Sequence, residues 1–319
     1  MSQKTRNIRL MVILAMLALS AIVLGLTRNE SKSTLENIDI FAVQDTARVD
    51  LISIIHKDKT IKLQKTDGVW ILNDRYKAEQ NIVRVLLSIL KDADVVRNVP
   101  KTQAASISEM IRERGYLVEI SADGKTLQSF YASGNENKTV SYMMPVDKAM
   151  PKTVNIPGYE SYVAGIFEIP ADDWRDRTIL STTWRALQRL DVDFAQFPEY
   201  SFAIEFKFNF LHIDGIEKLD TARMMGYIEQ FNYLQADKYL ARGQNEKYDS
   251  LLQTPETVTV SVTDINPENS KSIHFYPLIP DDPMMLGYVK EDEQMVLFQA
   301  DRIQTLFAVK AEFELGTIQ

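Results

Sequence analysis

The sequence predicts an α+β protein in which an N-terminal transmembrane helix precedes two tandem repeats of an antiparallel sheet packed with helices. Three observations support this prediction. An uncharged apolar segment lies close to the N-terminus, and short strand patterns alternate with helical patterns over the rest of the chain. In addition, the two halves of that remainder resemble each other at a displacement of about 140 residues.

The apolar segment runs from Leu10 to Leu26 without a charged side chain. As a helix it would span about 26 Å, close to the hydrocarbon thickness of a bilayer. Lys4, Arg6 and Arg9 precede it, and the positive-inside rule therefore places the N-terminus in the cytoplasm and the bulk of the chain outside. The residues expected to form the membrane anchor include Leu10, Leu14, Leu17, Ile22 and Leu26.

These features divide the N-terminal region into a basic cytoplasmic stretch (residues 1–9), an anchor (10–27) and a polar linker (28–39). A cleaved signal peptide is the alternative, because it has the same basic and apolar parts. The anchor is favoured because the apolar run is longer than a typical signal core. It also ends without a clear cleavage site of small residues, and the chain has no Cys for a lipid attachment.

The duplication predicts a first repeat over residues 40–167, a junction over 168–177 and a second repeat over 178–319. Apolar residues of both strands and helices keep nearly the same displacement, which is unlike a chance match. The pairs are Val49 with Leu187, Leu63 with Ile204, Trp70 with Phe210, Leu86 with Tyr227, and Val118 with Val258.

In the first repeat, alternating and β-branched segments predict three strands, VDLISIIH, TIKLQK and GVWIL, from Val49 onward. Helical spacing predicts helices over residues 78–96 and 103–114, and Gly115 is expected in the left-handed conformation that ends many helices. The remaining expected elements are strands over 116–122, 126–131, 140–145 and 153–156, and a helix over 159–167.

The second repeat is expected to follow the same order. Asp220 is a candidate N-cap for a helix that continues to about Arg242. The expected strands cover residues 186–194, 200–206, 208–213, 257–263, 272–278, 286–289 and 295–298, and a last helix covers 300–309.

The densest polar motif lies in the junction and consists of Asp172, Asp173, Trp174, Arg175, Asp176 and Arg177. We interpret it as an inter-domain clasp: Asp172 caps a turn, Trp174 fills the seam, and the arginines bind carboxylates or carbonyls. A partner-binding surface is a second interpretation, since Trp and Arg are favoured anchors. An acid/base pair among the three aspartates, as in glycan hydrolysis, is a third.

Composition excludes several functions. The net charge is −8 without a basic stripe, which argues against nucleic-acid binding. There is no Cys, and His56, His212 and His274 are scattered without metal-ligand spacing, so neither a metal nor another cofactor is expected. The aromatic segment FAIEFKFNF from Phe202 is interpreted as core or interface, with a strip that grips a glycan or peptide as the alternative.

Several segments also carry a family resemblance. FAVQDTARVDLISI from Phe41, DGVWILNDRYKAEQNIVRVLLSILK from Asp67, VNIPGY from Val154 and DDWRDRTIL from Asp172 resemble bacterial single-pass membrane proteins with domain of unknown function 4340, common in Bacteroidota. Such proteins often lie beside ABC-transporter components of the gliding-motility type. The resemblance implies an envelope accessory role but supplies no catalytic residue. The second repeat departs further, with Phe210 in place of the tryptophan of DGVW.

Together these observations predict a non-enzymatic accessory protein in the bacterial inner membrane, with its bulk in the periplasm. Its expected partners are the lipid bilayer and an inner-membrane complex such as an ABC transporter. A tethered glycan-acting enzyme using Asp172, Asp173 or Asp176 is the alternative, as is a glycan or solute receptor with a cleft between the repeats. We further expect the repeats to have divided roles, with partner contacts near the seam.

Overall fold

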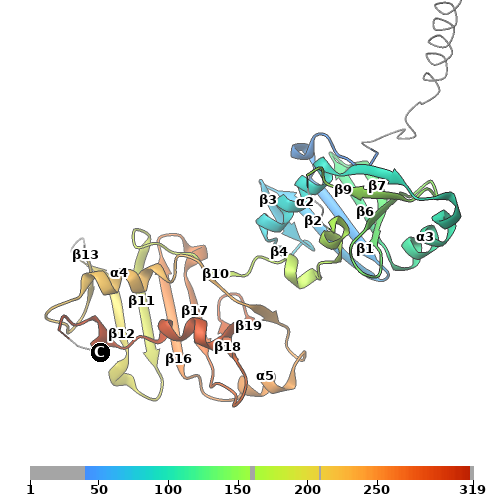
Figure 1. The fold of residues 1–319 in the computed structure, drawn as a ribbon. Helices are drawn as coiled ribbons and strands as arrows, with labels where there is room; N and C mark the ends of the chain where they lie inside the picture. The colour runs from blue at the N-terminus through green and yellow to red at the C-terminus, as the bar shows by residue number, and fades with distance from the viewer. Residues whose placement is uncertain (1–39, 159–161, 208–209, 317–319) are drawn as a thin grey trace, which may run out of the picture. The chain divides into compact units, whose positions relative to one another are not determined.

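The computed structural model describes residues 40–158, 162–207 and 210–316 and divides the chain into two compact units. Unit 1 is Met1–Trp174 and unit 2 is Arg175–Gln319, so the boundary falls within the stretch expected to be the junction. Both units are α+β with antiparallel sheets, as the sequence predicts (Figure 1). The predicted anchor lies outside the described residues, and none of the described helices combines the length and apolarity that a membrane span requires.

In the described part of unit 1, nine strands form one sheet in the order β4-β3-β2-β1-β6-β7-β8-β9-β5. Every neighbouring pair is antiparallel. The strands are β1 (Leu51–His56), β2 (Lys59–Thr66), β3 (Val69–Leu72), β4 (Tyr76–Lys77), β5 (Asp94–Asn98), β6 (Tyr116–Ala122), β7 (Lys125–Gly134), β8 (Ser141–Pro145) and β9 (Lys152–Asn155).

Helices α2 (Gln80–Asp92) and α3 (Lys101–Arg114) cover opposite faces of this sheet. The buried face of α2 packs in one core cluster with alternate residues of β7, among them Phe130. Ser133 of β7 points the other way, and its hydroxyl contacts the sulfur of Met110 in α3 at 3.6 Å. Successive strand residues face opposite sides, so one strand contributes to both layers. Short 3-10 turns at Thr46–Arg48, Val163–Glu168 and Ala171–Trp174 complete the unit.

In the described part of unit 2, eight strands form the main sheet in the order β13-β12-β11-β16-β17-β18-β19-β15, and β10 pairs with β14 separately. The strands are β10 (Thr178–Leu180), β11 (Leu187–Phe194), β12 (Phe202–Lys207), β13 (Phe210–Ile213), β14 (Leu234–Gln235), β15 (Lys238–Leu240), β16 (Val258–Asp264), β17 (Lys271–Phe275), β18 (Met284–Val289) and β19 (Gln294–Gln299).

Helices α4 (Thr221–Glu229) and α5 (Glu246–Leu251) again cover opposite faces. Val296 and Phe298 of β19 belong to the core beneath α4, whereas Met295 and Leu297 pack with Tyr248 of α5. Helix α6 (Ala300–Ile303) and 3-10 turns at Pro198–Tyr200, Pro267–Asn269, Gln304–Phe307 and Lys310–Phe313 complete the described part of this unit.

The two strand orders correspond strand for strand, with β4 as an addition in unit 1. Ile54 lies opposite Val118 in unit 1, and Val192 lies opposite Val260 in unit 2. Val118 therefore corresponds to Val260. The sequence comparison instead pairs Val118 with Val258, which lies two residues away on the same face of the strand. The slip leaves the side chain on the buried face, since residues two apart on a strand share a face.

The expected pairing of Trp70 with Phe210 is wrong by one residue. Leu63 lies opposite Leu72 and Ile204 opposite Ile213, so Trp70 corresponds to Leu211, which packs against the core. Phe210 is instead 75% exposed. A one-residue offset reverses the face of a strand residue, and aromatic identity alone therefore misleads the alignment.

The structure shortens two predicted helices, with one strand following the first and two strands following the second. The helix expected over residues 78–96 ends at Asp92, and β5 follows. The helix expected to reach Arg242 ends at Glu229, and β14 and β15 follow. In each unit the partner strand comes much later in the chain, since β5 pairs with β9 and β15 pairs with β19. Such distant pairing overrides the local helical spacing on which the prediction depended.

Three smaller expectations also change. Gly115 has φ −79° and ψ 172°, which is extended and not left-handed. The helix expected over residues 159–167 is a 3-10 helix at Val163–Glu168, with residues 159–161 outside the described part. The last expected helix is α6 followed by a 3-10 turn, Gln304–Phe307. Asp220, in contrast, caps α4 as predicted, because its carboxylate accepts the Arg223 N–H at 3.0 Å.

Candidate functional site

The first half of the Asp172–Arg177 motif belongs to unit 1. Trp174 is fully buried in the core of this unit, and its indole N–H donates to the carbonyl of Ile169 at 3.2 Å. The carbonyl of Trp174 accepts the backbone N–H of Glu79, next to α2, at 2.7 Å. The tryptophan therefore ties the end of the unit to its helix layer. Asp172 is exposed on the 3-10 turn that precedes it.

Arg175 belongs to unit 2. Its guanidinium carbon lies 3.2 Å from the ring centroid of Tyr239, and its Nη1 donates to Gln294 at 3.0 Å. Tyr239 and Gln294 lie on the neighbouring strands β15 and β19. Burial raises the pKa of Tyr239, and the Arg175 charge acts in the opposite direction. The stacked arginine thus covers the edge of the second sheet.

Asp176 and Arg177 are held by the same edge. The Tyr239 hydroxyl donates to the carbonyl of Asp176 at 3.0 Å, and the Asp176 carboxylate accepts the Thr178 N–H at 2.9 Å. Arg177 Nη1 donates to the Asp237 carbonyl at 3.1 Å. Each half of the motif is therefore anchored within its own unit. The predicted clasp, and the predicted acid/base pair of Asp172 or Asp173 with Asp176, stay predictions.

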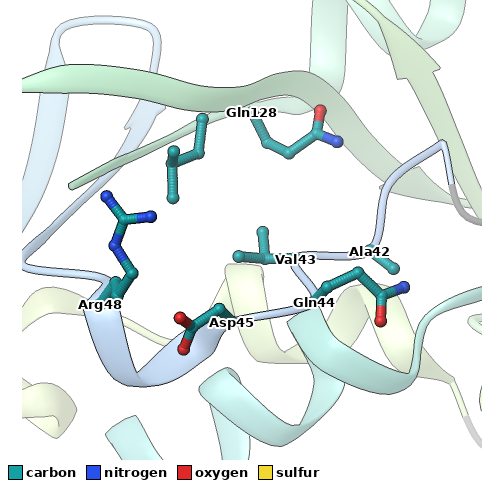
Figure 2. Close-up of a pocket in the computed structure, with 7 residues that line it drawn as sticks. Ala42, Val43, Gln44, Asp45, Arg48 and Gln128 are labelled. Atoms are coloured by element: carbon teal, nitrogen blue, oxygen red, sulfur yellow. The ribbon is translucent and has the colours of Figure 1, made fainter.

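A small pocket of about 230 Å³ opens in unit 1 beside the start of β7. Figure 2 shows Arg48 and Asp45, from the segment before β1, opposite Gln128. Arg48 is already paired with Asp123 at 3.0 Å, and Gln128 donates to the carbonyl of Ile40 at 3.1 Å. The pocket is smaller than typical ligand sites, and these two polar side chains serve the local structure. It supports no particular ligand.

A wider groove of about 750 Å³ lies in unit 2 between α4 and the C-terminal turns. Its walls are joined by polar contacts: Arg223 pairs with Glu312 at 3.3 Å, and Thr305 donates to Gln230 at 2.6 Å. The groove is therefore a packing gap between the C-terminal segment and α4, not a separate ligand site.

The outer face of the second sheet, opposite α4, carries a charged network. Arg189, Glu205 and His212 lie in register across β11, β12 and β13, and Arg189 is ion-paired with Glu205. Asp214 accepts hydrogen bonds from Lys207 at 3.2 Å and from the His212 ring at 2.9 Å. Those two contacts, led by Lys207, lower the pKa of the Asp214 carboxyl. The charged residues on this part of the face favour contact with water.

The corresponding face of the first sheet carries apolar residues at several of these positions, with Ser53, Lys62 and Glu119 in register between them. The strand registers match Leu51 with Arg189, Ile71 with His212, Ile55 with Asp193, Leu117 with Thr259, and Tyr131 with His274. The five residues of unit 1 in this comparison are all half-buried. We call them the outer apolar row. The sequence does not predict this row, for two reasons. The displacement between matched residues grows along the repeat, and local alternation does not show which residues pair across strands.

A polar cluster of unit 1 also escaped prediction. The Glu168 carboxylate accepts hydrogen bonds from Tyr162 and, at 2.8 Å, from Lys138. Burial, followed by the contact with Glu168, raises the pKa of the Tyr162 hydroxyl. His56 stacks on the neighbouring Tyr116 with ring centroids 4.5 Å apart. These residues are spread over most of the unit in the sequence, so no local motif predicts that they lie close together. Among the described residues, no group of three or more side chains is arranged to hold a metal.

Comparison of the chain with family models, curated proteins and solved structures finds no match. The resemblance to proteins with domain of unknown function 4340 therefore stays a prediction.

Proposed function

We propose that this protein is a membrane-anchored, periplasm-facing accessory subunit of an inner-membrane complex of the ABC-transporter type, acting by binding and not by catalysis. The observation that supports the proposal best is the difference between the outer faces of the two sheets. The same framework carries the outer apolar row in unit 1 and a charged network in unit 2.

The outer apolar row has the chemistry of an interface. Ile55, Leu117 and Tyr131 lie directly opposite one another across β1, β6 and β7. Leu51 and Ile71 lie on a second register line, joined through Gln64 of β2, and Ser53 separates Leu51 from Ile55 along β1. These side chains are half-buried on the face that also carries α3. Partly exposed apolar and aromatic residues of this kind are enriched where a partner covers a surface. A protein partner with a complementary apolar ridge would cover this row.

The outer face of unit 2 makes a natural internal control for this idea. Asp193, Thr259 and His274 occupy the positions of Ile55, Leu117 and Tyr131. Removing such charged and polar groups from water is unfavourable unless each finds a partner. We therefore assign partner binding to the face of unit 1 and a solvated role to the face of unit 2.

Site-specific photo-crosslinking in native membranes tests the proposal. The full chain carries p-benzoylphenylalanine either at Leu117 or at the matched position Thr259. We expect the Leu117 variant to form an adduct that mass spectrometry identifies as an integral inner-membrane transporter subunit, and the Thr259 variant to stay at background. Adding Tyr131→Glu to the Leu117 variant should remove the adduct, because Tyr131 lies opposite Leu117 in the row.

Recovery of the Leu117 variant only as an uncrosslinked monomer would contradict the proposal. Equal adducts at Leu117 and Thr259 would contradict the assignment to unit 1. Turnover of an envelope glycan by the purified full chain would support the enzymatic alternative.

A further inference from the structure

Four large apolar side chains of unit 2 are exposed at one end of its sheet. They are Trp184 (46% exposed), Phe206 (55%), Phe210 (75%) and Ile265 (65%). We call this set the apolar end. None of the four contributes to the clusters that form the core of this unit.

The strand registers place the four residues at the same end of the sheet. Leu187, three residues after Trp184, pairs with Asp264, and the N–H of Ile265 donates to the carbonyl of Ala186 at 2.9 Å. On the other side of β11, Arg189 pairs with Glu205, so Phe206 lies at the same end of the sheet.

Phe210 begins β13 opposite Lys207 of β12, so it lies at the same end of the sheet as Phe206 but on the opposite face, since Phe206 pairs with Leu211. The strands β16, β11, β12 and β13 are neighbours (Figure 1). Neighbouring strands are about 4.8 Å apart, so the apolar end extends over roughly 15 Å.

The chemistry of the apolar end is that of a membrane interface. Trp and Phe stand beside two cations: the Arg185 guanidinium lies 4.7 Å from the Trp184 ring, and Lys207 follows Phe206 directly. Lys207 is paired with Asp214 at 3.2 Å and with Glu205, so attraction to anionic lipid is not the main driving force. Aromatic rings flanked by basic side chains are characteristic of the headgroup region.

The position of these residues also favours lipid over a folded partner. They occupy strand ends and the turns between strands, not a sheet face or a groove. A fluid surface can accept several such tips without shape complementarity. Under the proposed function, the apolar segment Leu10–Leu26 anchors the chain in a bilayer, so a lipid surface is present next to the protein.

We propose that the apolar end of unit 2, formed by Trp184, Phe206, Phe210 and Ile265, inserts into the interfacial layer of the bilayer that anchors the chain. The inference rests on the membrane anchorage of the proposed function and adds a second contact with the same membrane. It gives unit 2 a role of its own beside the partner-binding role of unit 1.

The tryptophans provide a selective test. The chain has three, and Trp70 and Trp174 are 5% and 0% exposed in the core of unit 1. Only Trp184 is therefore available to a lipid-borne quencher. The full chain is reconstituted in nanodiscs of phosphatidylcholine, with or without bromine on the acyl chains near the headgroup. We expect bromine to remove up to about one third of the tryptophan emission, since one emitter of three reaches the interface.

Variants identify the source of the quenching. Trp184→Phe should abolish it, and Phe206→Ser with Phe210→Ser should reduce it. The matched control is Phe197→Ser, because Phe197 is also half exposed but follows β11 at the opposite end of that strand. It should leave the quenching unchanged.

The outcomes separate this inference from the proposed function. A chain that stays in the nanodiscs but shows no quenching overturns the inference and leaves the anchorage standing. A chain that does not stay in the nanodiscs contradicts the anchorage itself. Shielding of Trp184 that depends on protein concentration but not on bromine would assign the apolar end to self-association and overturn the lipid contact.

Discussion

At the scale of single residues, Gly115 shows how a correct choice of residue can have an unexpected cause. A glycine directly after a helix predicts a left-handed turn, yet its φ of −79° suits any residue. The actual requirement is space. A Cβ at this position would lie 2.3 Å from the carbonyl oxygen of Ile111 and 3.0 Å from that of Ala132. Neither backbone atom can yield easily, and only the folded neighbours reveal the constraint.

We expect Gly115→Ala to destabilise unit 1 by about 1–3 kcal/mol, because the methyl group must displace backbone. Urea unfolding of the full chain in detergent, followed by the emission of Trp70 and Trp174, measures the change. Gly226→Ala is the control: Gly226 lies within α4 with nothing within 4 Å of the added carbon. It should gain up to about 1 kcal/mol in unit 2 from helix propensity, which circular dichroism of the same transition follows, since Trp70 and Trp174 report on unit 1. A Gly115→Ala protein as stable as the parent would contradict the crowding.

At the scale of elements, what could be predicted follows the range of the interactions involved. Helix α2 was found from its own sequence, because Val83, Leu86 and Leu90 repeat at helical spacing and all three are buried. The strands joined by short turns were found for the same reason. β5 and β15 were missed, since each is short and owes its conformation to a strand that comes much later in the chain. The outer apolar row is also a product of distant pairing.

The contact between α4 and the C-terminal segment leads to a prediction on pH. The buried hydroxyl of Tyr227 donates to the carbonyl of Leu306 at 2.7 Å, and burial raises the pKa of this hydroxyl above its usual value. Above the unfolded-state pKa of about 10, the unfolded chain loses the proton while the folded chain keeps it. The stabilisation is therefore complete below pH 10 and falls as pH rises further.

Tyr227→Phe tests this linkage. At neutral pH we expect a loss of about 1–2 kcal/mol, because the Leu306 carbonyl loses its donor. Between pH 10 and 11 the parent should lose up to about 1.4 kcal/mol more than the variant, so that the difference narrows. Urea unfolding monitored by circular dichroism at pH 8, 10 and 11 gives the values. Tyr200→Phe, at an exposed residue, should change neither value; a difference for Tyr227→Phe that is independent of pH would contradict the linkage.

At the scale of the whole molecule, the two units share one framework and differ in their surfaces. Both units keep the same strand order and a helix on each face. The first carries the outer apolar row, and the second has a charged network on its outer face and the apolar end. The sheet faces and strand ends are where we propose the two units to have different roles. Within the junction motif itself, Trp174 and Arg175 serve their own units.

These surfaces can act in the proposed way only if both units lie on the periplasmic side of the membrane, and the absence of Cys makes that testable. Single cysteines are introduced as Val85→Cys in α2 and Tyr233→Cys in unit 2, both at exposed positions, and as Ser2→Cys in the basic N-terminus. In cells with a permeabilised outer membrane, we expect an impermeant maleimide to label the first two variants. Ser2→Cys should react only after the inner membrane is lysed, because the positive-inside rule retains its segment in the cytoplasm. Labelling of Ser2→Cys in unlysed cells while Val85→Cys stays unlabelled would reverse the topology, and the partner-binding face would then lie in the cytoplasm.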